Sequence, residues 1–334
     1  MTGLMSSLAQ RARRAAGRLP VTRLRELSRR RSVRLALRAA AVLAVLLFLA
    51  YAVYRNWDEL VQYEWTADWR YVALAAVVYG LSFAANVLAW HRVMATVWTV
   101  TDPWVNARVF CYSSLPKRIP GVVWYIASRA ALYQAEGVAG SIAVMATLLE
   151  TLLLIVSALL VYLASLLFRV PAGMAGDLPP GIALLLLVPL LAVLHPAVLN
   201  RIIAWLLRRL KGGGEIVLTY RTTLGLVLIY VPAWVIGGID LYLLANAVYP
   251  VPLALLPAVC GAWAASGAVS LLAAYLVQGL GAAEVTLGLL LSRFLPVPVA
   301  IVVVLLFRLL CTVGEVAWAL LVGWTLSRVK VKGS

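Results

Sequence analysis

Four charged residues lie inside long apolar stretches of this 334-residue chain: Arg129, Glu150, Glu284 and Arg308. An isolated charge in the hydrocarbon of a membrane is so costly that such residues face the protein interior, pair with one another and mark routes for ions or polar groups. The charge order is reversed between the two stretches: a cation precedes an acid in the first, and an acid precedes a cation in the second. We expect Glu150 and Arg308, each near the middle of a predicted span, to face each other. The alternative interpretation is a polar contact that only holds helices together.

Two short glycine-containing segments interrupt the apolar stretches, at 115–121 and at 278–284. Lipid offers no hydrogen bonds, so a broken backbone at membrane depth must be satisfied by protein or by water in a cavity. Broken helices at corresponding positions of two halves indicate a transport site, and glycine lets the backbone approach a bound group closely. We therefore predict that the functional site lies between the two breaks.

The predicted site also includes side chains around the first break. Lys117 and Arg118 suit a lipid phosphate, although anchoring at the membrane interface explains them equally well. Trp124 lines the site or sits in an aromatic belt. Arg129 has Tyr125 one helical turn behind it, and snorkelling to water is the alternative role of Arg129. The predicted binding residues are Lys117, Arg118, Pro120, Gly121, Trp124, Arg129, Glu150, Gly279, Gly281, Glu284 and Arg308.

The sequence offers little for catalysis or metal binding. Cys111, Cys260 and Cys311 have no paired spacing, which argues against a disulfide framework and a zinc site. We predict no catalytic residue, no metal and no cofactor.

Intramembrane proteolysis is the rival enzymatic interpretation. Ser266 with a histidine suggests a serine protease, and the sequence Gly-Gly-Ile-Asp ending at Asp240 suggests an aspartyl protease. Neither has the G-x-S-G or G-x-G-D spacing of those enzymes, and no second catalytic aspartate is apparent. Asp240 and Arg221 instead lie near opposite ends of one predicted span, where interface positions account for both.

Composition assigns the chain to the membrane. Hydrophobic residues make up 64% of it and charged residues only 13%, which excludes a soluble core wrapped in a polar surface. The net charge of +16 is concentrated in the first 38 residues, where eleven arginines stand against Glu26 alone. We interpret residues 1–34 as a basic cytoplasmic tail that is attracted to anionic lipid, before an uncleaved anchor rather than a cleaved leader. No aromatic residue interleaves these arginines, so nucleic acid is not the predicted partner.

The predicted fold class is an all-α polytopic membrane protein. A span needs about 20 apolar residues, and the candidates are 35–54, 71–90, 141–168, 181–195, 222–248 and 299–326. The loop after the first span is acidic, whereas the loop after the fourth is rich in arginine, so the positive-inside rule places the latter and both termini in the cytoplasm. We predict a multi-pass protein of the cytoplasmic membrane.

Two apolar regions remain between these spans, and each begins and ends on one side of the membrane. Residues 104–136 are expected to form a re-entrant hairpin from inside, and residues 253–294 one from outside. Each half then reads span, span, hairpin, span in opposite orientations, which is an inverted repeat. The predicted organisation is a first repeat at 35–168, a second at 181–326 and a short cytoplasmic tail at 327–334.

The motifs at the breaks resemble a known family. The run from Ile119 to Trp124, then Arg129-Ala-Ala-Leu, Gly137-Val and Leu-Leu-Glu150, is similar to the P-G-x-V-W, R-x-x-L, G-V and L-L-E pattern of the lysylphosphatidylglycerol synthase transmembrane (flippase-like) family. The segment from Gly279 to Glu284, followed by Leu-Phe-Arg308-Leu, resembles its second signature, G-G-L-G-x-R-E and L-x-R-L. Gln278 and Ala283 depart from that signature by replacing a glycine and an arginine.

The resemblance implies a function of lipid movement without the soluble synthase domain that some members carry. We expect translocation of an anionic phospholipid or lipid-linked glycan between leaflets, with no enzymatic activity. The alternative is a non-transporting subunit that binds such a lipid and presents it to a glycosyltransferase partner.

Overall fold

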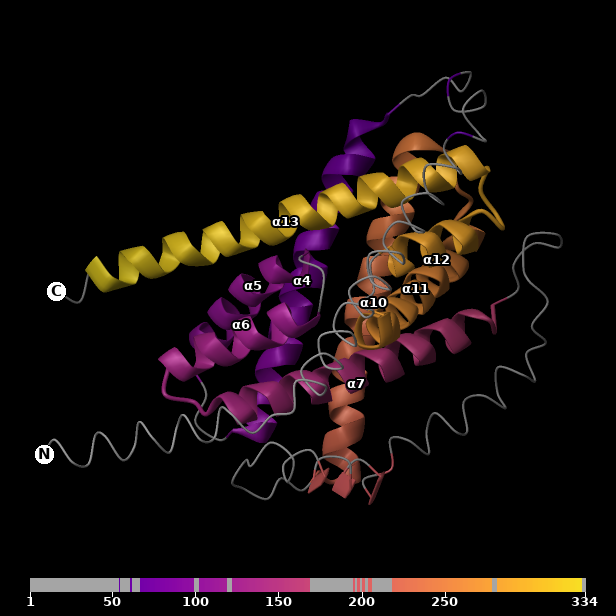
Figure 1. Cartoon of the computed structure of the whole chain (residues 1–334). Coiled ribbons are helices and arrows are strands. Elements are labelled where there is room, and N and C mark those ends of the chain that lie inside the picture. Colours follow the sequence, from indigo (N-terminus) through magenta and orange to yellow (C-terminus); the bar gives the residue numbers. More distant parts are fainter. Residues whose placement is uncertain are drawn as a thin grey trace, which may run out of the picture.

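The computed structural model describes residues 67–98, 102–118, 122–168, 218–277 and 281–331, with isolated residues at 54, 61 and between 195 and 205. All regular structure in these ranges is helical, and five helices are long and apolar enough to cross a membrane (Figure 1). The long helices are α4 (Trp69–Val97), α7 (Gly140–Ser165), α10 (Tyr220–Val248), α11 (Leu256–Val277, extended by the 3-10 turn Leu253–Leu255) and α13 (Val297–Val331). The protein is therefore a polytopic helical membrane protein.

Helices α4 and α10 form an antiparallel pair at the centre of the fold. Asp68 caps α4 by accepting a hydrogen bond from the Arg70 amide, and Thr219 caps α10 in the same way. The Asp68 amide binds the Ala247 carbonyl oxygen at 2.9 Å, and the Ser82 hydroxyl binds the Ala233 carbonyl oxygen at 3.2 Å. The residue numbers of both pairs add to the same total, so the two helices stay in one register over four turns.

The first break separates two helices that are too short to cross the membrane. Helix α5 (Pro103–Ser114) starts at the Asp102 cap with proline in its first turn, a 3-10 turn (Leu115–Arg118) follows, and α6 (Val122–Ala135) then leads into α7. At 1.5 Å per residue, α5 and α6 are about 18 and 21 Å long, against about 30 Å of hydrocarbon.

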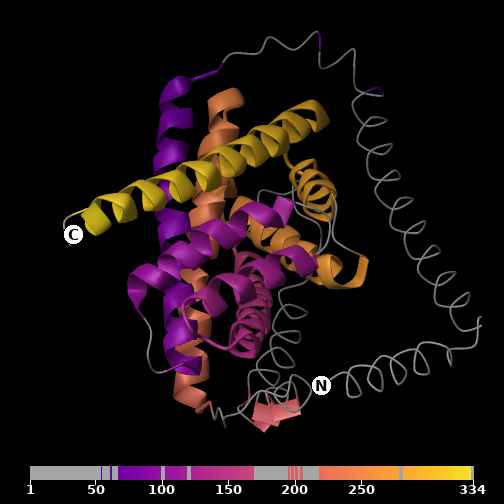
Figure 2. The same cartoon turned by 60° about the vertical axis from the view of Figure 1, so that its left-hand side comes forward.

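The second break lies between α11 and the short helix α12 (Ala282–Leu291). Gly281 caps α12 with a φ of +75°, a left-handed conformation that glycine adopts without strain. The two broken segments are unequal, because α11 has membrane-spanning length whereas neither α5 nor α6 does. Helix α13 lies obliquely across the outside of α4 and α5 (Figures 1 and 2).

Tight contacts between α10 and α11 rely on reciprocal tryptophan and glycine positions. A Cβ atom added to Gly267 of α11 would lie 2.2 Å from the Trp234 ring, and one added to Gly237 of α10 would lie 2.5 Å from the Trp263 ring. Each helix thus offers a glycine to the tryptophan of the other, which lets the two backbones approach closely.

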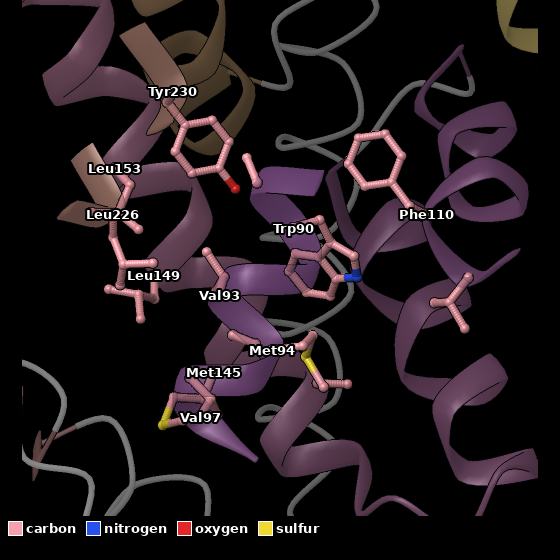
Figure 3. Close-up of a cluster of buried hydrophobic side chains, with 14 of the residues drawn as sticks. Trp90, Val93, Met94, Val97, Phe110, Met145, Leu149, Leu153, Leu226 and Tyr230 are labelled. Carbon is pink, nitrogen blue, oxygen red and sulfur yellow. The ribbon is translucent and has the colours of Figure 1, made fainter. Parts of the chain in front are cut away.

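The largest apolar core lies where α4, α5, α6, α7 and α10 meet (Figure 3). Val93 and Met94 of α4 face Leu149 and Leu153 of α7 and Leu226 of α10, all almost fully buried. A second core joins the Ala75 end of α4 to α10, α11, α12 and α13. These two cores hold the broken segments against the long helices.

Four predicted spans, at 71–90, 141–168, 222–248 and 299–326, coincide with α4, α7, α10 and α13. The predicted spans 35–54 and 181–195 and the basic tail 1–34 lie outside the described residues. Helix breaks occur in both predicted hairpin regions, 104–136 and 253–294.

Candidate functional site

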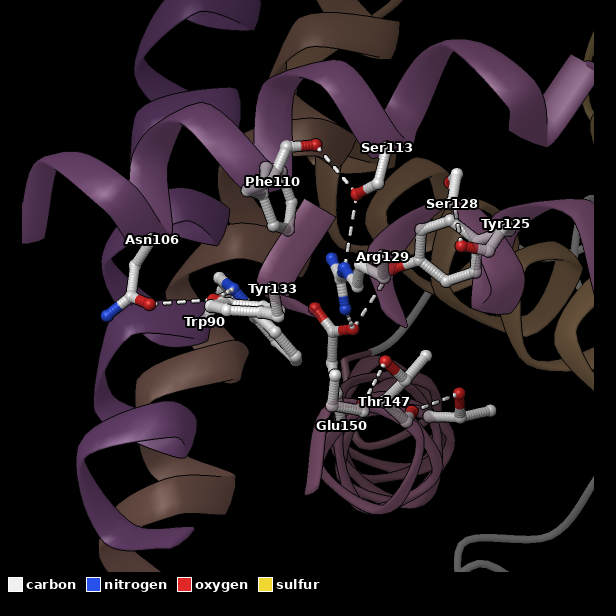
Figure 4. Close-up of polar contacts among 12 residues, drawn as sticks. Trp90, Asn106, Phe110, Ser113, Tyr125, Ser128, Arg129, Tyr133, Thr147 and Glu150 are labelled. Carbon is white, nitrogen blue, oxygen red and sulfur yellow. Dashed lines mark hydrogen bonds and ion pairs between the residues drawn. The ribbon is translucent and has the colours of Figure 1, made fainter. Parts of the chain in front are cut away.

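A buried ion pair joins the helix after the first break to the following long helix. Arg129 of α6 binds Glu150 of α7, with side chains 0% and 3% exposed (Figure 4). The Tyr125 hydroxyl donates to the same Glu150 oxygen at 3.1 Å, and the Arg129 Nε donates to the Ser113 hydroxyl at 3.1 Å. The Nη2 of Arg129 is also buried and has no hydrogen-bond partner in the described part of the chain. The pair therefore retains a spare donor.

Aromatic rings enclose the guanidinium group of Arg129. Its Cζ lies 3.6 Å from the centroid of the Trp90 ring, 4.6 Å from that of Tyr125 and 5.2 Å from that of Phe110. Ring faces attract cations, most strongly where water is excluded. The rings thus stabilise the charged form of Arg129 on faces that Glu150 does not reach.

Trp90 is itself held in place by a chain of polar contacts. Its Nε1 donates to the Tyr133 hydroxyl at 2.9 Å, and that hydroxyl donates to Asn106 at 2.6 Å. The Asn106 amide nitrogen lies 2.8 Å from Nδ1 of His91. This chain runs from the buried guanidinium to the half-buried His91 on the surface of α4.

Lys117 in the first break shares two rings with Arg129. Its Nζ lies 4.8 Å from the Tyr125 centroid and 5.3 Å from that of Phe110. Two cations thus share one pair of aromatic rings.

The last turn before the second break meets the same part of α7. The Tyr275 hydroxyl of α11 lies 2.9 Å from the hydroxyl of Thr151, the residue after Glu150. Tyr230 of α10 is fully buried beside this region, and its hydroxyl has no hydrogen-bond partner within the described ranges. Polar side chains from both broken segments therefore gather at the centre of α7.

A second ion pair stands after the second break. Glu284 in the first turn of α12 binds Arg308 of α13. The Glu284 side chain is 12% exposed and that of Arg308 is 45% exposed. The pair of Glu284 and Arg308 is therefore partly exposed, whereas the pair of Arg129 and Glu150 is buried.

The predicted pairing of Glu150 with Arg308 is wrong. Each acid pairs with the cation of its own half: Glu150 with Arg129, and Glu284 with Arg308. The short helix after each break packs on the following long helix, which brings the nearer charges in sequence together. Depth within a span was a poor guide to pairing because it says nothing about which face of each helix meets the other.

The remaining predicted residues fall into three groups. Trp124 is 57% exposed, which agrees with a position in an aromatic belt. Gly281 caps α12 in a left-handed backbone conformation, which favours glycine at this position. Pro120, Gly121, Gly279 and the side chain of Arg118 lie outside the described residues.

Asp240 corrects a second expectation. Arg221 is exposed at the start of α10, as an interface residue should be, but Asp240 is fully buried, and neither of its carboxylate oxygens has a hydrogen-bond partner among the residues that the structure describes. Sequence reasoning also missed Trp90, Asn106 and Tyr133. The one local feature of the sequence that indicated the contacts among Trp90, Tyr133 and Asn106 was the asparagine within α5.

A scan against models of protein families finds no match for this chain, and a search of curated proteins finds none either. In the described residues, no cluster of three or more histidine, cysteine, aspartate or glutamate side chains suited to a metal ion occurs.

Proposed function

We propose that this protein moves an anionic phospholipid or a lipid-linked glycan between membrane leaflets, with the polar head group passing along α7 between the two helix breaks. The observation that carries the proposal is the buried Arg129, which lies beside the first break and keeps one unpartnered donor at Nη2. Arginine binds phosphate oxygens in a planar, bidentate geometry, so a head group can replace Glu150 as its partner.

Both breaks contribute polar groups to this route. Tyr125 follows the first break and reaches Glu150, while Tyr275 precedes the second and reaches Thr151. Broken helices place backbone groups at membrane depth where they bind a substrate. Arg308 lies at the open end of the route, partly exposed on α13 between the exposed Leu305 and Leu309.

An inverted repeat is part of the proposal. Exchanging α4, α5, α6 and α7 with α10, α11, α12 and α13 maps the helix contacts onto one another. Helix α7 packs on α11 as α13 packs on α5, and α6 packs on α7 as α12 packs on α13. The two ion pairs occupy equivalent positions with reversed charge order. In this arrangement the broken segments are re-entrant hairpins from opposite sides.

The resemblance of the break motifs to the lysylphosphatidylglycerol synthase transmembrane family supports the same function. The proposed setting is the cytoplasmic membrane with both termini inside, and the proposed partner is the lipid itself. No catalytic step is proposed for the chain.

Leaflet exchange in proteoliposomes tests this function. A fluorescent phosphatidylglycerol in the inner leaflet is bleached by external dithionite only after it crosses the bilayer. Wild-type protein should therefore accelerate the loss of fluorescence relative to empty vesicles. Arg129→Lys keeps the charge but loses the planar contact with Trp90 and part of the donor set, so exchange should fall about tenfold, equivalent to about 1.4 kcal/mol.

Arg108→Lys is the matched control, because Arg108 pairs with Glu136 at a partly exposed position of α5. Its exchange rate should equal that of wild type. Absence of exchange with every anionic phospholipid and polyprenyl-phosphate sugar tested, while these lipids still bind, would favour the subunit that presents a lipid to a glycosyltransferase.

A further inference from the structure

Helix α10 carries a buried carboxyl group that the proposed lipid route does not use. Asp240 is 0% exposed, and neither Oδ1 nor Oδ2 has a hydrogen-bond partner in the part of the chain that the structure describes. The other fully described buried acid, Glu150, is bound by both Arg129 and Tyr125. Among the buried acids of the described helices, Asp240 is therefore unusual because it has no hydrogen-bond partner.

The surroundings of Asp240 are small and apolar. The preceding turn holds Gly237 and Gly238, and a Cβ atom at Gly238 would lie 2.6 Å from the backbone of Cys260 in α11. On the other side, the antiparallel register places the fully buried Ala75 of α4 level with Asp240. The buried Asp240 therefore lies on α10 level with Ala75 of α4 and next to the close contact of α10 with α11.

Several titratable groups on the neighbouring helices make contacts elsewhere. Tyr79 of α4 donates to the Cys311 carbonyl of α13, and the Cys260 thiol of α11 points to the Val235 carbonyl. On α13 and α12, Arg308 and Glu284 bind each other, and on α7 Glu150 is held by Arg129. On α10 itself, the Tyr242 hydroxyl donates to the Val251 carbonyl. In the described part of the chain, neither carboxylate oxygen of Asp240 has a hydrogen-bond partner.

We propose that Asp240 is a proton-binding site that holds its proton while α10 and α11 are packed at Gly238 and releases it to water when this contact opens, which couples proton movement to lipid exchange. An ionised carboxylate without a partner in an apolar interior is strongly unfavourable, so the closed arrangement requires the neutral acid. On opening, the O–H bond breaks, the proton passes to water and the carboxylate becomes solvated.

A proton suits this site better than a metal cation. Sodium and divalent ions require several oxygen ligands, whereas the Asp240 oxygens have no hydrogen-bonding neighbour and share no cluster of acids within the described ranges. One carboxyl group is sufficient for a proton.

Infrared spectroscopy of the purified protein tests the proton site without any transport assay. The C=O stretching band of a protonated carboxyl group should be present at neutral pH, should disappear in Asp240→Asn and should persist in Asp102→Asn. Asp102 is a suitable control because it is an exposed helix cap, accepting from the Trp104 amide at 2.7 Å. The chain holds only five aspartates, so ¹³C-labelled aspartate shifts the same band in wild type and assigns it even if the variant folds poorly. A spectrum without this band would overturn the proposal.

The coupling rests on the proposed function and needs a second measurement. In proteoliposomes with an imposed pH gradient, lipid exchange by wild type should change several-fold, and exchange by Asp240→Asn should not respond. Exchange that ignores the gradient in wild type, with the band present, would show that the proton is only structural and would overturn the coupling. If wild type moves no lipid at all, the proposed function and its coupling fail together, while the infrared result still decides whether Asp240 binds a proton.

Discussion

The buried pair of Arg129 and Glu150 concentrates the chemistry of the candidate site in two side chains. Burial removes both charges from water, and the desolvation is offset by Tyr125, Ser113 and the Trp90 ring. Such a pair adds little net stability compared with apolar residues, yet removing one partner leaves an uncompensated charge. Stability therefore depends on both members being present.

Replacing Glu150 alone should cost more stability than replacing both members of the pair. Glu150→Gln leaves Arg129 charged and without its anion, so the free energy of unfolding should fall by about 3–5 kcal/mol. The double variant Arg129→Met with Glu150→Leu should recover part of that loss, because no charge then remains buried. Thermal melting in detergent measures both.

Glu136→Gln is the control for the same chemistry at the surface. The side chains of Arg108 and Glu136 are 26% and 33% exposed, so loss of this pair should cost about 0–1 kcal/mol. Equal losses at Glu150 and Glu136 would contradict the distinction between a buried and a solvated pair.

Helices α10 and α11 approach each other because glycines face tryptophans. Trp234 occupies the space over Gly267, and Trp263 occupies that over Gly237. Glycine lowers intrinsic helix stability, so its presence here follows from packing. The same close contact lies next to Asp240, which links the packing of this helix pair to the proposed proton site.

Alanine should change stability in opposite directions at a glycine that packs against a tryptophan and at a glycine without a close neighbour in the described residues. Gly267→Ala places a methyl group 2.2 Å from the Trp234 ring and should destabilise by about 1–3 kcal/mol. Gly225→Ala on α10 meets no described residue within 4 Å and should stabilise by about 1 kcal/mol through helix propensity. Melting temperatures that move in the same direction for both variants would contradict the packing.

Across the whole molecule, the antiparallel pair α4 and α10 defines two ends. The start of α4 lies beside the end of α10, where Asp68 binds Ala247. Arg92, Arg108 and Arg221 lie toward the opposite end of these helices. By the positive-inside rule we expect that end to face the cytoplasm.

Cysteine labelling tests this orientation in intact cells. In a background lacking Cys111, Cys260 and Cys311, single cysteines at Ala67 and Pro250 should react with a membrane-impermeant thiol reagent from outside. Cysteines at Ala135 and Tyr220 should react only after permeabilisation. Opposite accessibility of Ala67 and Pro250 would contradict the helix pairing, whereas a reversal at all positions would contradict only the orientation.

Composition and hydrophobic periodicity were sufficient to predict an all-helical membrane protein, four of its long helices and both breaks. These features depend on local properties: an apolar run of sufficient length must bury or cross, and clustered proline and glycine residues favour a break between helices. The sequence also identified Arg129, Glu150, Glu284 and Arg308 as charges within apolar runs, because a charge in an apolar run is visible without any partner.

Partner choice was not visible in the sequence. Glu150 pairs with Arg129 instead of Arg308, Asp240 is buried instead of exposed, and Trp90, Asn106 and Tyr133 join the site from separate helices. Each of these depends on which face of one helix meets which face of another, and that is fixed by side-chain packing between segments distant in sequence. Local pattern therefore determines which groups enter the membrane, and tertiary packing determines which of them meet.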